Sequence, residues 1–321
     1  MITDVPLLAH APRPTTHFTD LTVETADNHV GPWQPNWPVG TERRVLSRDP
    51  DTGGSLTLLR FPAGYDRHEE AAIARTGRPQ RFEHHSCHEE IVSLEGDYAF
   101  GVPQLYRFDA PGYLNHPPYW LHPARQHSEQ GVLLLVRNSH PVDFGFCAVP
   151  DDWDGQEYYL DVAEVTPSAS EAVTTLSLDD LTLEPIVEHG HPLPGVLGRQ
   201  LWHDVVSGWR TWLLAAAEGA PLATGRGADG DAGGDAGGDA GGGVGGDADG
   251  YAGGDEWFVL EGTVRFEEPD GSSALLERYG HRCDPQRYPA GGAAAAASSD
   301  VRMLRWVRGP QLTTRASGTD G

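Results

Sequence analysis

The sequence has few cysteines, no long apolar run and an excess of acidic over basic side chains. Only three cysteines occur in 321 residues, Cys87, Cys147 and Cys283, and this odd, widely spaced set gives neither a disulfide framework nor a CxxC zinc motif. The set is typical of a reducing compartment, and we expect a cytoplasmic protein. No stretch of 18 apolar residues occurs, and MITDVPLLAHAPRP lacks a basic start followed by an apolar core. We therefore expect neither a membrane span nor export.

The charge balance restricts the partners. Lys and Arg together number 23 against 47 Asp and Glu, which gives a formal net charge of −24. A chain of this sign is repelled by phosphate backbones and anionic lipids, so we expect no nucleic-acid and no membrane partner. The expected partner is a small-molecule substrate, with a homodimer as one option for the assembly. A chain of this length with 38% apolar residues can bury the cores of two ordinary domains.

An internal repeat supports two domains. The segments 40–64 and 195–219 align without a gap at an offset of 155, and so many matches at one offset indicate a duplicated structural unit. The matched residues of the first copy are Gly40, Arg44, Leu46, Asp49, Gly53, Leu58, Leu59 and Gly64, and those of the second are Gly195, Arg199, Leu201, Asp204, Gly208, Leu213, Leu214 and Gly219.

Further along, EEIVSLEG at 89–96 falls on DEWFVLEG at 255–262, now at an offset of 166. The change of offset indicates an insertion in the second copy, where a Gly/Asp/Ala-rich tract covers 227–254. This tract has almost no apolar side chains to offset its ordering entropy, so it is expected to be disordered. We predict a first domain over 1–165, a second over 185–310 that contains the insert, and a disordered tail over 311–321.

The local pattern predicts strands. LTLLRF, EIVSLEG, YAFGV, GVLLLVR and FGFCAV are short runs of β-branched, aromatic or leucine residues bounded by Gly, Pro, Asp and Asn. No long helical periodicity is evident. The expected fold is all-β, with two consecutive barrels or sandwiches.

Two motifs carry the chemistry. EHHSCHEEIVSLEG at 83–96 places histidines and carboxylates ahead of a strand and a glycine turn, and YLNHPPYWLH at 113–122 adds a distant histidine. The first resembles the first cupin motif, a His-x-His pair followed by a Glu and, after six more residues, a Gly. The second resembles the second cupin motif, in which a Pro precedes the last histidine ligand. The closer resemblance is to anti-sigma-factor-type metal-binding cupins and small cupin dioxygenases.

The resemblance implies two tandem jelly-roll β-barrels and a divalent metal inside the first. Glu89 takes the glutamate position, His85 the second histidine position and His122 the histidine of the second motif. Glu83 stands where the family has its first histidine. Either Glu83 is a carboxylate ligand, or the neighbouring His84 shifts inward, or the site has three protein ligands. Residues two apart on a strand share a face, so Glu83 and His85 can point inward together, and we prefer Glu83.

Three other histidines of the first copy, His88, His116 and His127, are assigned structural roles as surface or core residues. In the second copy, His85 falls on Tyr251, Glu89 on Asp255 and His122 on Tyr288 at the offset of 166. Both histidines are absent there, so the second barrel is expected to be degenerate and to bind no catalytic metal.

Imidazole and carboxylate ligands suit Fe(II), Zn, Mn or Ni, and the resemblance favours Fe(II). The function implied is that of a metal-dependent cupin enzyme acting on a small organic molecule, an Fe(II)-dependent dioxygenase, with Glu83 as a fourth ligand or a catalytic base. The alternative is a non-enzymatic bicupin that binds or senses a ligand in a metal-dependent way.

Overall fold

The structure of the chain is a computed structural model, and the residues that it describes divide into two units. Among the described residues, the division lies between Leu181 and Thr182. None of these residues forms a helix long and apolar enough to cross a membrane. The insert expected at 227–254 lies outside the described residues, which are 33–36, 40–49, 52–66, 81–100, 106–123, 126–142, 145–148, 158–159, 174–188, 190–203, 209–223, 255–267, 271–284, 294–308 and 312–314.

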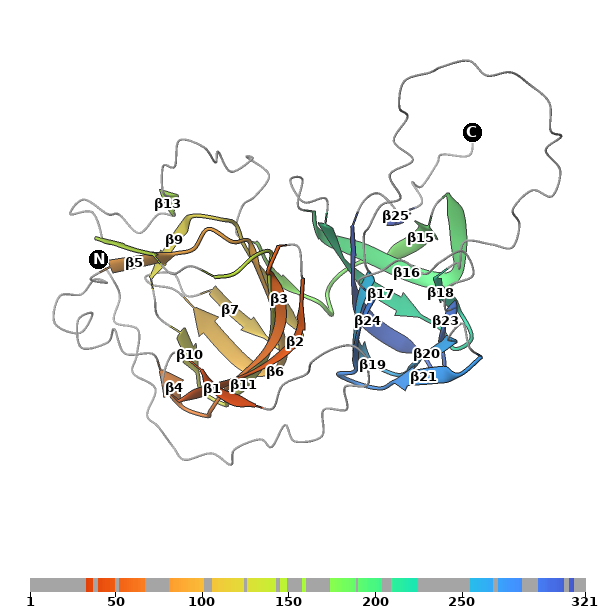
Figure 1. Ribbon diagram of the computed structural model, residues 1–321, viewed down its shortest axis with the longest axis horizontal. Helices are drawn as coiled ribbons and strands as arrows, with labels where there is room; N and C mark the ends of the chain where they lie inside the picture. The colour runs from red at the N-terminus through yellow and green to blue at the C-terminus, as the bar shows by residue number, and fades with distance from the viewer. Residues whose placement is uncertain are drawn as a thin grey trace, which may run out of the picture. The chain divides into compact units, whose positions relative to one another are not determined.

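Unit 1 is built from two antiparallel sheets (Figure 1). The larger runs in the order β1 (Gln34–Asn36), β2 (Thr41–Arg48), β3 (Ser55–Phe61), β11 (Val132–Asn138), β6 (Glu89–Phe100), β10 (Gln126–Ser128) and β4 (Tyr65–Asp66). The long strand β6 also pairs with β7 (Tyr106–Asp109) and β8 (Gly112–His116), and β8 pairs with β14 (Thr174–Ser177). The smaller sheet has the order β12 (Gly145–Ala148), β5 (Arg81–His84), β9 (Trp120–Pro123) and β13 (Tyr158–Tyr159).

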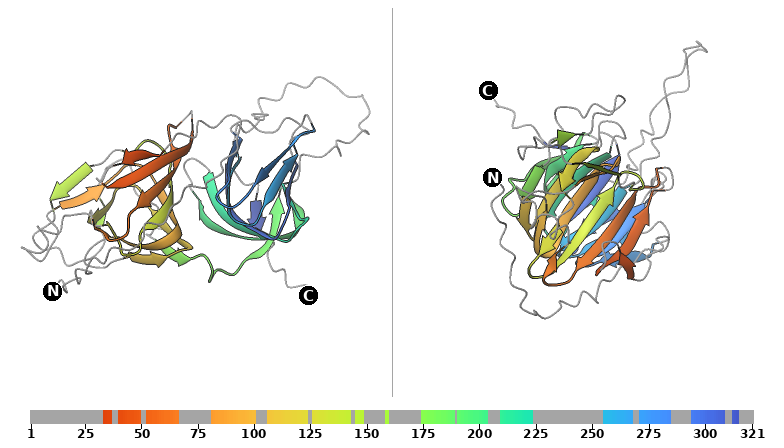
Figure 2. Two further views of the ribbon diagram at one scale, coloured as in Figure 1. Left: turned by 90° about the horizontal axis from the view of Figure 1, so that it is seen from below. Right: turned by 90° about the vertical axis from the view of Figure 1, so that its left-hand side faces the viewer.

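Unit 2 has the same plan of one large and one small antiparallel sheet (Figure 2). The large sheet has the order β22 (His281–Asp284), β19 (Asp255–Glu261), β24 (Val301–Arg308), β17 (Trp209–Ala216), β16 (His191–His203), β15 (Glu184–Glu188) and β25 (Leu312–Thr314). The small sheet has the order β18 (Pro221–Ala223), β23 (Ala294–Ala297), β20 (Val264–Glu267) and β21 (Ser273–Leu276). All the described regular structure of both units is β, as the strand pattern predicted.

The strand registers reproduce the repeat in detail. The pairing of β2 with β3 is bulged between Val45 and Ser47, and that of β16 with β17 between Gln200 and Trp202, which are the same positions at the offset of 155. A second bulge lies where β6 and β19 approach their glycine turns. Because a bulge redirects the strand that carries it, shared bulges indicate the same barrel curvature in both units.

Two strands lie outside the expected domain limits. β14 pairs with β8 and so extends the sheet of unit 1 beyond 165. β25 pairs with β15 inside the segment expected as a disordered tail over 311–321. Both are short and have no periodic pattern of their own. They are ordered by pairing with the neighbouring strands β8 and β15, which the local sequence pattern does not reveal. The structure differs from the prediction at these two places, while the remaining domain limits stay a prediction.

Candidate metal centre

Three strands and one turn bring the motif residues together inside unit 1. His85 follows β5 directly, Glu89 begins β6, His116 ends β8, and His122 lies in β9. Glu89 and His116 are cross-strand partners in the β6–β8 pair, and side chains of directly opposed residues on one face lie close together. Segments more than thirty residues apart in the sequence therefore meet in one buried cluster.

The core of the cluster is three histidines. The ring nitrogens of His85, His116 and His122 that could hold an ion all lie within 4.8 Å of one another. Their exposed fractions are 3%, 1% and 4%, so the three rings are withdrawn from water. The three rings also lie close to one another, with centroids 5.4 to 6.1 Å apart, one pair stacked and the other two tilted. Three buried imidazoles converging on one point are a donor set that could hold a transition-metal ion.

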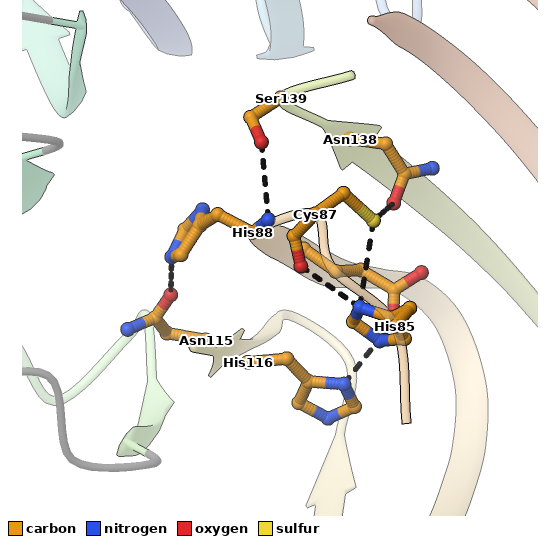
Figure 3. Close-up of polar contacts among 8 residues, drawn as sticks. His85, Cys87, His88, Asn115, His116, Asn138 and Ser139 are labelled. Atoms are coloured by element: carbon orange, nitrogen blue, oxygen red, sulfur yellow. Dashed lines mark hydrogen bonds and ion pairs between the residues drawn. The ribbon is translucent and has the colours of Figure 1, made fainter. Parts of the chain in front are cut away.

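A backbone contact fixes the orientation of His85 (Figure 3). Its Nδ1 lies 2.8 Å from the carbonyl oxygen of Cys87, and since a carbonyl can only accept, Nδ1 carries the proton. The lone pair is then on Nε2, which is buried, has no hydrogen bond to a described residue, and lies 3.7 Å from Glu89 Oε2. Histidines that bind a metal through one ring nitrogen usually donate the N–H of the other ring nitrogen to a carbonyl or a carboxylate. This geometry fits a bound metal.

Glu89 adds a carboxylate to the cluster. Its Oε2 lies 3.1 Å from His116 Nδ1 and 3.7 Å from His85 Nε2. Donors bound to one ion at about 2.1 Å each are separated from one another by about 3 to 3.5 Å. The spacing between the Glu89 oxygen and these nitrogens is therefore close to that of ligands sharing one ion.

The surroundings favour the protonation states that a metal requires. Burial lowers the pKa of His116 below its usual value, despite the opposing effect of Glu89. Burial alone would raise the pKa of Glu89, but the hydrogen bond with His116 and the neighbouring His85 outweigh it and lower that pKa. A neutral imidazole thus faces an ionised carboxylate, and metal ions bind these forms.

The side chains of Glu83 and His84 point in different directions. Glu83 is 2% exposed, lies directly opposite His122 in the β5–β9 pair and lines the cavity beside the cluster. His84, on the other face of β5, is half-buried and contacts the ring of Tyr119 at a centroid distance of 6.5 Å. The alternation of side chains along β5 therefore turns Glu83 toward the cluster and His84 away.

The cluster borders a cavity of about 350 Å³ in the barrel interior, the size of small-molecule sites. Glu83, His85, Glu89 and His122 lie on its wall. The rest of the wall is part apolar and part polar, and consists of Arg43, Val45, Arg48, Gly53, Ser55, Thr57, Leu59, Phe61, Ile91, Tyr98, Gln126, Leu134, Val136, Asn138, Pro141 and Val142.

Unit 2 fills the corresponding space with side chains. In unit 1, Thr57, Val136 and Ile91 are neighbours across three strands on the cavity wall. The matching registers of unit 2 bring together Trp212, Arg305 and Trp257. All three are at most 2% exposed, and the Arg305 guanidinium lies 4.2 Å from the Trp257 ring centroid.

The Arg305 side chain is held in place by Glu188 at 2.6 Å. Two large indoles and a paired arginine thus occupy the volume that three smaller side chains leave open in unit 1. Of the residues aligned with His85, Glu89 and His122, Tyr251 and Tyr288 lie outside the described residues, as does the side chain of Asp255. The group of His85, His116 and His122 is the one cluster of its kind found in the described part of the chain.

His116 is the residue that motif reasoning missed. From the sequence it is expected to have a structural role, because it lies at neither histidine position of the two cupin motifs. Its place in the cluster follows from the register of β8 against β6, which sets it opposite Glu89. His88 and His127 do have other surroundings: His88 contacts the Asn115 side-chain oxygen, and His127 lies 3.8 Å from Asp66.

The chain matches no protein-family profile and no curated protein sequence. Solved structures resemble it over most of its length. A provisionally assigned dioxygenase from Nostoc punctiforme is 12% identical with a TM-score of 0.52, and the match covers 86% of this chain and 78% of that one. The protein has a two-barrel cupin fold. This conclusion rests on the duplicated barrel, the registers and the overall match together.

Further cupin structures match more loosely. A salicylate 1,2-dioxygenase mutant from Pseudoaminobacter salicylatoxidans is 14% identical with a TM-score of 0.48, covering 83% of this chain and 76% of that one. A cupin 2 conserved barrel domain protein from Leptotrichia buccalis is 10% identical with a TM-score of 0.44, covering 84% and 88%. At identities this low, the chemistry of the protein has to be argued from its site.

Proposed function

We propose that this cupin is a metal-dependent enzyme that acts on a small organic molecule, and that it is an Fe(II)-dependent dioxygenase. The observation that carries the proposal is the buried convergence of His85, His116 and His122 beside an open cavity. A structural metal site is usually closed by protein ligands, whereas this one borders a space that a small molecule can enter.

The proposed ligands are His85, His116 and His122, with Glu89 as the carboxylate donor. Three imidazoles and one carboxylate suit Fe(II), and they also accept Zn, Mn or Ni. When bound, Fe(II) would supply the capacity to bind and activate oxygen beside an oxygen-bearing substrate. The chain's own residues hold the ion, exclude water through the apolar walls formed by Phe61, Leu134 and Val136, and orient the substrate.

Glu83 is proposed as the catalytic base. It is buried, lies on the cavity wall and is directly opposite His122 in the β5–β9 pair. A buried carboxylate on the substrate side of a metal site can take the proton of an incoming enol or hydroxyl group. Loss of a general base typically slows turnover by about 100-fold or more.

Glu83→Gln is therefore expected to keep a full equivalent of metal and to lower kcat by about 100-fold. Metal content by elemental analysis and steady-state kinetics on the same preparation check this result. A variant that loses its metal would instead make Glu83 a ligand, and one that keeps both metal and kcat would remove it from the mechanism. Glu42→Gln, at a half-exposed glutamate on β2 that pairs with Arg60, is the matched control.

The reaction class is tested by oxygen uptake. Fe(II)-loaded protein is mixed with β-diketones, hydroxyketones and catechols in an oxygen electrode, with and without each substrate. We expect substrate-dependent uptake that disappears in the His85→Ala and His122→Ala double variant. Tight binding of one of these compounds without any uptake would favour a ligand-binding or sensing protein over a dioxygenase.

A further inference from the structure

The cavity has a basic side that the proposed ligands do not use. Arg48 and Arg43 both line it from β2, and both residues are also exposed to solvent. Neither has an ion pair or hydrogen bond with a described residue, whereas Arg60 on the neighbouring strand pairs with Glu42. Within the described part of the chain, these two cavity arginines therefore have no acidic partner, although the net charge of the chain is −24.

The strand registers place Arg48 level with the metal cluster. Arg48 lies opposite Ser55, Ser55 opposite Asn138, and Asn138 opposite Glu89. This polar row therefore crosses four strands of the large sheet, and a fifth residue, His116, continues it on β8. With about 4.8 Å between strands, the backbone of Arg48 is roughly 14 Å from that of Glu89 along the sheet.

The row between Arg48 and Glu89 is rich in hydrogen-bond donors. The Asn138 side-chain oxygen accepts from the Cys87 thiol at 3.7 Å, which leaves its amide NH₂ available as a donor. Ser55 adds a hydroxyl, and Arg48 adds a planar guanidinium that matches a carboxylate in two-point contact. Such a row suits an anionic oxygen group.

The next rows along the barrel are apolar. Val136 and Ile91 are cross-strand partners in the row next to the polar row, and Leu134 and Leu59 are partners in the row after that. A ligand lying across this wall would bury its hydrocarbon part there while its polar ends meet the metal and Arg48.

We propose that the cavity binds an organic carboxylate with an apolar body: an oxygen group at one end meets the metal, and the carboxylate at the other end is held by Arg48, with Arg43 adding positive potential. This inference rests on the proposed function, whose site it shares. It names Arg48 as the residue that selects the substrate class.

The charge balance around the cavity supports an anion. A divalent ion is offset by Glu89 and, nearby, by Glu83, so the two arginines leave the lined space with net positive charge. Charge-assisted hydrogen bonds to a guanidinium are stronger than neutral ones, and an uncharged analogue of the same shape forfeits them. The predicted signature is a preference for the charged form of otherwise matched ligands.

The test uses the full-length protein loaded with Zn(II), which binds ligands without redox turnover. The probes are 3,4-dihydroxyphenylacetate, whose catechol oxygens can meet the metal, and its neutral amide. We expect calorimetry to give an affinity at least about tenfold higher for the acid, since a charge-assisted bond contributes that much. In Arg48→Met this preference is expected to fall below about threefold, with the Zn(II) content unchanged.

Arg265→Met is the matched control, because it removes the same charge from an exposed position on β20 of unit 2. It should keep the full preference for the acid. Equal affinity for acid and amide in the natural protein, no binding of either, or an undiminished preference in Arg48→Met would each overturn the carboxylate proposal. The Zn(II) content is measured before the calorimetry. If the protein binds no Zn(II), the result contradicts the proposed function, and the carboxylate proposal falls with it.

Discussion

Replacing His116 by alanine is expected to lower the affinity of the protein for its divalent metal by more than 100-fold. Loss of a partner that only orients a ligand typically costs 10–100-fold in metal affinity, so loss of a ligand should cost more. The measurement is a competition titration with a chromophoric chelator, followed by elemental analysis after dialysis. Activity should disappear together with the metal.

His127→Ala is the control for this experiment. His127 is also buried in unit 1, with an exposed fraction of 5%, but it lies beside Asp66 and outside the cluster. It should keep a full equivalent of metal. Equal affinities in the natural protein and in folded His116→Ala would exclude His116 as a ligand and return the site to His85, Glu89 and His122.

Replacing Gly96 by alanine is expected to destabilise unit 1 by about 3–5 kcal/mol, since left-handed backbone and overpacking costs add. Gly96 has φ +82°, and an added Cβ would lie 1.8 Å from the Gly131 carbonyl oxygen, which is backbone and cannot rotate away. Gly262 repeats the arrangement in unit 2, where the added atom would meet the Asp300 carbonyl oxygen at 2.0 Å. Urea denaturation followed by circular dichroism measures the loss.

Gly40→Ala separates the two causes. Gly40 has φ +94°, yet an added Cβ has no neighbour within 4 Å, so only the backbone conformation is penalised, by about 1–2 kcal/mol. If both variants lose the same stability, the contact with Gly131 has no energetic weight and the turn tolerates a side chain. A gap of about 1–3 kcal/mol between them is the expected result.

Motif spacing led to His85, Glu89 and His122, and these residues do lie together, although they come from the turn after β5, from β6 and from β9. The resemblance to the two cupin motifs supplied the long-range pairing that spacing within one motif does not give. His116 was not selected, since its place depends on which strand pairs with β6 and in which register. Arg48 is a similar case: nothing local distinguishes it from Arg44 or Arg43, and three strand pairings are needed to bring it level with Glu89. Pairing registers are long-range, and one sequence does not reveal them.

The fold followed from the sequence more completely. The offsets of 155 and 166 reappear in the strand registers, down to the bulges at Val45 and Gln200. A third offset, 169 between Val132 and Val301, lies in strands whose sequences have diverged too far to align by eye. The degenerate character of unit 2 was expected from its missing histidines, whereas the filling of its interior by Trp212 and Trp257 required the packing itself.

The central claim is one metal per chain, held in unit 1. The most direct test is elemental analysis of protein purified without chelators. The metal content is expressed per mole of protein, with the protein concentration determined by amino-acid analysis, and the His85→Ala and His122→Ala double variant is measured alongside. The account predicts one equivalent of divalent metal in the natural protein and less than a tenth of an equivalent, roughly, in the variant. Two equivalents in the natural protein, or one equivalent retained by the variant, would contradict it.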